Sequence, residues 1–124
     1  KQRLVEVDLD QKVYTDGELS DAEMTLDFCE QLKSAGPWGQ AFPEPLFHGV
    51  FDVVQSRIVG QQHLKLVLRR PESELLIDGI AFFVERPEYW LGIRQVRIAY
   101  KLDINEYNGQ RNIQFIIDFL EKLA

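Results

Sequence analysis

The sequence predicts a mainly β protein, a five-stranded barrel preceded by a strand and a helix from an α/β unit. Two observations carry this prediction: apolar and polar residues alternate from residue 47 onward, and turn residues divide that region into five runs. The chain has 124 residues, 45% of them hydrophobic. That length is typical of one domain, and the apolar content is sufficient for a core.

The first 36 residues predict one strand and one helix. Alternation from Arg3 to Asp8 is typical of a half-buried strand. The tetrapeptide Ser20-Asp21-Ala22-Glu23 has the form of a capping box, and it predicts a helix over residues 21–34 that ends before Gly36-Pro37. Four residues are expected on the inward face of this helix: Met24, Phe28, Cys29 and Leu32. A piece of this size cannot bury a core of its own, so we expect it to be the end of a preceding domain.

A stiff linker is expected over residues 37–46. Its prolines fix φ and restrict the residue that precedes each of them. Two large aromatic residues, Trp38 and Phe42, are expected to pin the linker against the domain that follows.

The five strand-like runs occupy residues 47–59, 62–70, 75–84, 94–105 and 111–120. Glu85–Gly92 is the longest gap, with room for a short helical turn, and Asn108-Gly109 is a strong signal for a hairpin turn. Five strands without a long helix favour a small barrel over residues 47–124. The OB-fold is the leading candidate, and an SH3-like barrel is the alternative.

The net charge of −6 is unevenly distributed. Residues 1–31 carry nine carboxylates against three cations, whereas the remaining 93 residues carry equal numbers of each sign. From Arg57 to Arg70 there are four cations and no carboxylate. Because binding depends on the local potential, the acidic average does not exclude a nucleic-acid partner.

The second strand-like run separates apolar from basic residues. Its three leucines, Leu64, Leu66 and Leu68, share one face and are expected inside the barrel, which leaves His63, Lys65 and Arg69 outside. In OB-folds this strand, its neighbour and two loops form the usual surface for single-stranded nucleic acid. An ordinary solvated outer face is the alternative, since exposed charge also discourages edge pairing.

The last hairpin adds an aromatic ring, a planar cation and an amide, which suit stacking and phosphate contacts. Its tyrosine could equally pack against a cross-strand neighbour. The candidate DNA-binding residues are Arg57, His63, Lys65, Arg69, Tyr107, Arg111 and Gln114.

Neither a catalytic nor a metal site is expected in this chain. Asp8 and Asp10 share a strand face, but no third ligand is placed to complete a metal site. Cys29, the single cysteine, is expected to be a core thiol in a reducing compartment. No window approaches the roughly 20 apolar residues that a membrane span needs, so no membrane role is expected.

Three separated segments in matching order, and a short fourth one that fits the middle strand, resemble the C-terminal region of the RecJ family, bacterial single-strand-specific exonucleases of the DHH phosphoesterase superfamily. The matching segments are Gly36–Phe47, Val59–Leu66, Asp78–Phe82 and Tyr100–Gly109, with Arg111 and Gln114 after them. Trp38 and Gln40-Ala41-Phe42 have the form typical of the proteobacterial branch.

The resemblance implies a parent enzyme that degrades single-stranded DNA from 5′ to 3′ in repair and recombination, in the cytoplasm. Its Mg²⁺ or Mn²⁺ would be held by a DHH domain that these residues do not include, so this piece alone is expected to be inactive. Residues 1–36 would be the C-terminal end of the DHHA1 domain. Residues 37–46 would link it to the OB-fold, which residues 47–124 would form. The implied partners are single-stranded DNA and the acidic C-terminal tail of the single-strand-binding protein.

Overall fold

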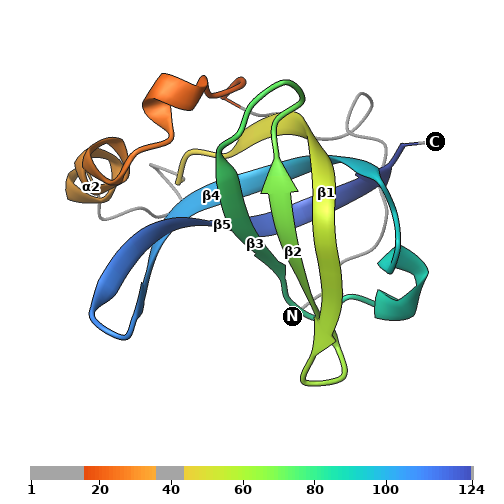
Figure 1. Ribbon diagram of the computed structural model, residues 1–124. Coiled ribbons are helices and arrows are strands. Elements are labelled where there is room, and N and C mark those ends of the chain that lie inside the picture. Colours follow the sequence, from red (N-terminus) through yellow and green to blue (C-terminus); the bar gives the residue numbers. More distant parts are fainter. Residues whose placement is uncertain (1–15, 36–43, 124) are drawn as a thin grey trace.

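The computed structural model describes residues 16–35 and 44–123, and its main feature is a closed five-stranded barrel (Figure 1). The strands are β1 (Phe47–Val59), β2 (His63–Arg69), β3 (Leu76–Ala81), β4 (Gln95–Tyr107) and β5 (Gln110–Lys122). Around the barrel their order is β1-β2-β3-β5-β4, and every pairing is antiparallel except that of β3 with β5. The predicted β fold is confirmed, and it is consistent with an OB-fold.

The barrel interior is filled by the residues that the alternation of β2 predicted. Leu64, Leu66 and Leu68 are completely buried. Beside them the rings of Tyr100 and Phe115 stack with their centroids 3.8 Å apart, and Phe51 meets both rings edge-on. A core of aliphatic and aromatic side chains from all five strands therefore holds the barrel closed.

Two of the predicted connections are confirmed, and one strand is shorter than expected. Asn108 and Gly109 both have positive φ, as a two-residue hairpin turn requires. The 3-10 helix η2 (Pro87–Trp90) lies in the gap where a helical turn was expected. The run 75–84, however, ends as a strand at Ala81, because the chain turns at Phe83, whose φ is +54°.

The predicted helix over residues 21–34 is wrong as a single element. The 3-10 helix η1 (Asp21–Glu23) ends at Met24, and the α-helix α2 (Leu26–Ser34) starts afresh after Thr25. Thr25 caps α2, because its hydroxyl oxygen accepts a hydrogen bond from the Phe28 amide at 3.2 Å. The Ser20 and Glu23 pair closes only the short η1 turn: the Glu23 carboxylate accepts from the Ser20 amide at 2.9 Å.

The described N-terminal segment packs on the barrel. Leu19, Met24 and Cys29 belong to the same buried core as the strands, and Phe28 and Leu32 pack against it. This confirms the predicted inward face and the core position of Cys29, where burial raises the pKa of the thiol. The domain boundary at residue 36 stays a prediction.

Several expectations lie outside the described residues. They concern the strand from Arg3 to Asp8, the Asp8 and Asp10 pair, the Gly36-Pro37 helix stop and the contacts of Trp38 and Phe42. In the described ranges, no helix has the length and apolar character needed to cross a membrane.

Candidate nucleic-acid interface

The outer face of β1, β2 and β3, here called the β1–β3 face, carries the predicted basic residues in adjacent rows. Arg57 on β1 lies opposite Lys65 on β2, and Lys65 lies opposite Ile80 on β3. The next row joins Gln55, Val67 and Asp78. Arg57, Lys65 and this second row line a shallow hollow.

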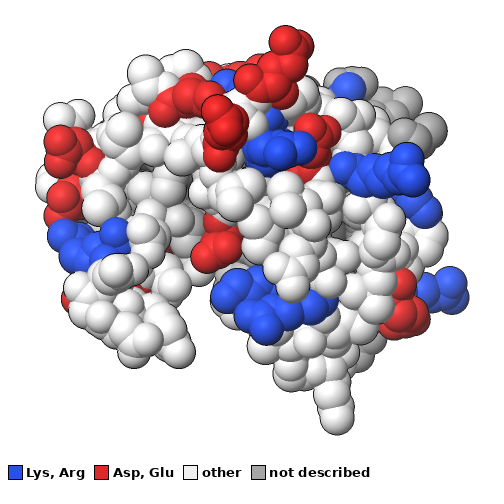
Figure 2. Space-filling view, in the orientation of Figure 1, with Lys and Arg blue, Asp and Glu red and all other residues white. Residues whose placement is uncertain are grey.

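Figure 2 shows the distribution of charge around this face. Basic side chains gather over the lower parts of β1 and β2, whereas acidic side chains crowd the margin near the N-terminal segment. The uneven charge along the sequence is therefore also uneven in space.

Arg57 and Lys65 are the central pair of the hollow. Within the residues that the structure describes, neither forms an ion pair with a carboxylate. Like charges placed directly opposite on neighbouring strands destabilise a sheet. An anion bound between the two side chains would remove this repulsion, so the pair suits a phosphate.

Asp78 forms the side of the hollow that is nearest to β5. Asp78 lines the hollow and lies opposite Gln114 in the parallel pairing of β3 with β5. Gln114 thus joins the β1–β3 face, although the sequence grouped it with the last hairpin. Asp78 was not singled out from the sequence. Its carboxylate repels a phosphate in the hollow, whereas Lys65 in the same hollow attracts one.

Arg69 lies at the far end of β2 from the hairpin that joins β1 to β2. Its guanidinium is 4.0 Å from the carboxylate of Asp52, its register partner on β1. Arg69 is exposed, but this carboxylate offsets part of its charge.

His63 is held in place by the segment that follows β3. Its Nδ1 accepts a hydrogen bond from the backbone N–H of Phe83 at 3.1 Å. Its ring centroid lies 5.3 Å from that of Phe82 and 4.9 Å from that of Phe83, in edge-on geometry. One polar atom and part of the ring are therefore already used within the protein.

The remaining two candidates lie on the β4–β5 hairpin. Tyr107 is 72% exposed next to the turn. Arg111 donates to the Glu30 carboxylate on α2 at 3.0 Å, and nearby Lys33 forms an ion pair with Asp103 at 2.8 Å. The structure thus brings Arg57, Lys65 and Gln114 to one face, with His63 at its edge, and uses Arg111 to fix a helix.

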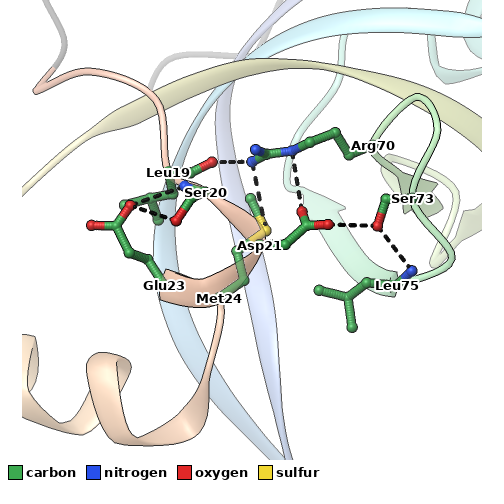
Figure 3. Close-up of polar contacts among 8 residues, drawn as sticks. All are labelled: Leu19, Ser20, Asp21, Glu23, Met24, Arg70, Ser73 and Leu75. Atoms are coloured by element: carbon green, nitrogen blue, oxygen red, sulfur yellow. Dashed lines mark hydrogen bonds and ion pairs between the residues drawn. The ribbon is translucent and has the colours of Figure 1, made fainter.

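Arg70, the fourth cation of the basic run, joins two parts of the fold (Figure 3). Its guanidinium donates to the carbonyl oxygen of Leu19 and lies 3.4 Å from the Asp21 carboxylate. Asp21 in turn accepts from the Ser73 hydroxyl at 2.7 Å. These contacts, here called the Arg70 clamp, tie the N-terminal segment to the β2–β3 loop.

No group of three or more potential metal-ligating side chains occurs among the described residues.

The strand order, the closed barrel and the basic outer face define an OB-type domain. The model of the RecJ OB domain family matches residues 15–118, and the chain belongs to this family. The match begins before η1 and α2, so it includes both helices.

Relatives and solved structures agree with this assignment. The single-stranded-DNA-specific exonuclease RecJ of Escherichia coli (strain K12) is 51% identical over 109 residues, which are 86% of this chain and 19% of that protein. The same-named protein of Haemophilus influenzae is 44% identical over 114 residues, covering 90% and 20%. The chain therefore spans about a fifth of the length of the curated relatives it matches.

A crystal structure of RecJ from Thermus thermophilus in complex with Mg²⁺ superimposes on 90% of this chain and 17% of its own, with a TM-score of 0.69 and 21% identity. A structure of the same protein with Mn²⁺ gives a TM-score of 0.71. These two likenesses support the fold.

Proposed function

We propose that this chain is the single-stranded-DNA-binding OB domain of a single-strand-specific DNA exonuclease that acts in DNA repair and recombination. Its relatives are named for that specificity. The observation that carries the proposal is the Arg57 and Lys65 pair, which lies in cross-strand register in a hollow on the β1–β3 face.

The pair would act by neutralising phosphates. Each phosphate that binds here releases condensed counterions, so affinity for a single strand should fall as salt rises. Gln55, which lines the hollow, and Gln114, which lies opposite Asp78, offer amides for hydrogen bonds to phosphate or base. Arg69, at the end of β2, and Tyr107, next to the β4–β5 turn, would contact the strand only where it leaves this face.

Catalysis belongs to other parts of the parent enzyme in this proposal. Hydrolysis of a phosphodiester needs bound metal ions or an activated nucleophile, and the RecJ structures named above were solved with Mg²⁺ or Mn²⁺. We propose that a DHH domain of the parent enzyme holds those ions and carries out the 5′-to-3′ reaction. We also propose that the parent enzyme is cytoplasmic. The proposed domains are 1–36 from DHHA1, 37–46 as linker and 47–124 as the OB-fold.

The test is a fluorescence-anisotropy titration of the 124-residue chain with a labelled single-stranded oligonucleotide across a salt series. The double variant Arg57→Glu/Lys65→Glu should lose about a hundredfold or more in affinity at low salt. The slope of log affinity against log salt should become shallower by about 0.7 per lost phosphate contact, hence by about 1.4 for both.

The matched control is Arg86→Glu, which reverses one exposed cation at the start of η2. It should keep both the affinity and the salt slope. If the double variant binds as the unaltered chain does, the β1–β3 face is not the DNA surface.

A second candidate is supported by the mixed chemistry of the hollow. Val67 lies between Gln55 and Asp78, two residues along β2 from Lys65, so the hollow combines an apolar side chain with two cations. The acidic, aromatic-ended tail of the single-strand-binding protein has the complementary chemistry. If docking is the main role, a peptide of that composition should bind the unaltered chain and bind Arg57→Glu much more weakly. The chain should then have little affinity for bare oligonucleotide.

A further inference from the structure

The lower edge of the β1–β3 face exposes a pair of phenylalanines that has no role in the core. Phe82 is 41% exposed and Phe83 is 37% exposed, directly after β3 ends at Ala81. Two adjacent exposed aromatic rings are unusual at a strand end, where burial would stabilise the fold.

The backbone at this point is held in a conformation that phenylalanine rarely adopts. Phe83 has φ of +54°, in the left-handed region that disfavours bulky side chains. The hydrogen bond from the Phe83 N–H to His63 Nδ1 and that from the Val84 N–H to the Gln62 carbonyl oxygen stabilise this turn. Strained backbone that the surroundings maintain is found preferentially at binding sites.

The pair lies close to the proposed phosphate contacts. His63 touches both phenylalanine rings and precedes Lys65 by two residues on the same strand face. Two strand residues span about 7 Å, which is of the order of one extended nucleotide step. A strand whose phosphates lie on Arg57 and Lys65 could therefore place its next base over the rings.

We propose that Phe82 and Phe83, held by His63, form a stacking subsite for a base of the single strand. This inference rests on the proposed function and deepens it, since it names the part of the ligand that the aromatic edge receives. His63 acts here as a positioning residue, because its Nδ1 and ring are used to orient Phe83 and Phe82. Stacking on aromatic rings tolerates any base, which suits a surface that must accept any sequence.

The experiment compares two ligands of equal length, an oligothymidylate and an abasic strand with the same phosphates. Phe82→Ala in the 124-residue chain should weaken binding of the oligothymidylate about tenfold, and it should leave abasic binding and the salt slope unchanged. Leu75→Ala is the matched control, since Leu75 is 38% exposed at the opposite end of β3. It should leave both affinities unchanged.

Two further measurements separate stacking from a folding defect. Phe82→Trp should restore oligothymidylate binding, whereas Phe82→Leu, which keeps the bulk but not the ring, should not. A fluorescent adenine analogue in the strand should be quenched by the unaltered chain and less by Phe82→Ala and Phe83→Ala.

Three outcomes would overturn the inference. In the first, Phe82→Ala weakens both ligands equally; in the second, it weakens neither. In the third, it reduces binding of an acidic, aromatic-ended peptide while oligothymidylate binding is unchanged. If the unaltered chain binds neither the oligothymidylate nor the abasic strand at low salt, the proposed function itself fails. If it binds both and only the effect of Phe82→Ala is absent, the stacking subsite alone fails.

Discussion

The basic residues of this domain fall into two regions with different partners. On the β1–β3 face, Arg57 and Lys65 line a hollow, and neither forms an ion pair with a carboxylate in the part of the chain that the structure describes. Around the N-terminal segment, Arg70 contacts Asp21, and Arg111 contacts Glu30. The acidic N-terminal segment therefore neutralises cations of the barrel on one side and leaves the other side available to an anion.

This comparison explains how an acidic chain can present a basic surface. A cation whose carboxylate partner lies within the protein stabilises the fold, whereas an unpaired cation adds to the potential that attracts phosphate. Removing a cation should thus change stability around the N-terminal segment and DNA affinity on the β1–β3 face.

The largest effect on folding is expected at the Arg70 clamp. Arg70→Met keeps much of the side-chain length but removes the donors to Leu19 and the ion pair with Asp21. Because hydrogen bonds to charged groups contribute about 1.5–3 kcal/mol, the free energy of unfolding should fall by about 2 kcal/mol in a urea titration. The folded variant should bind oligonucleotide as the unaltered chain does.

A variant Arg86→Met serves as the control for the clamp and should change stability little. Loss of DNA affinity in Arg70→Met without loss of stability would contradict the division between the two regions.

A smaller effect is expected at Asp78, where a substitution should raise the DNA affinity. Asp78→Asn removes the carboxylate from the hollow that Lys65 shares, and at low salt the affinity for a single strand should rise about threefold to tenfold. Isothermal titration calorimetry measures this directly. A fall in affinity would mean that Asp78 accepts a hydrogen bond from the ligand rather than opposing its phosphates.

Arg111→Gln should have a still smaller effect. Its ion pair with Glu30 is about half exposed on both sides, and such pairs contribute less than about 1 kcal/mol. We expect a small loss of thermal stability and no change in oligonucleotide affinity. A marked loss of affinity would place the β4–β5 hairpin in the DNA interface, as the sequence alone suggested.

The smallest effect concerns the η1 turn at low pH. Hydrogen bonds from the Ser20 amide and hydroxyl hold the pKa of Glu23 below its ordinary value of 4.5. A carboxylate with a lowered folded-state pKa contributes stability that is fully present above its unfolded pKa and lost as pH falls through the folded one. Glu23→Gln should therefore slightly reduce the decline of stability below about pH 4.5, seen in acid titrations followed by circular dichroism.

The strands were predictable because the alternation of Leu64, Leu66 and Leu68 is a local pattern that burial enforces. The continuous helix was not, because Thr25 competes with Ser20 as a cap and the chain breaks between them at Met24. The signal was present in the sequence: a threonine placed before an apolar stretch is itself a good helix cap.

The site was predictable only in part. Strand parity correctly placed Lys65 outside, but it could not show that Arg111 would meet Glu30, which lies 81 residues away. Nor could it show that Asp78 would enter the hollow, since that depends on the register of β2 with β3. The Phe82 and Phe83 pair was hidden because both residues were counted within a strand that in fact ends before them.

The most direct test of the division between the two regions is NMR mapping of backbone amides during titration with an oligothymidylate at low salt. We expect the largest shift changes at residues 55–59, 63–69 and 78–83, small changes near Tyr107, and little change on α2. Changes centred on α2 and the β4–β5 hairpin, with the β1–β3 face unaffected, would contradict the account.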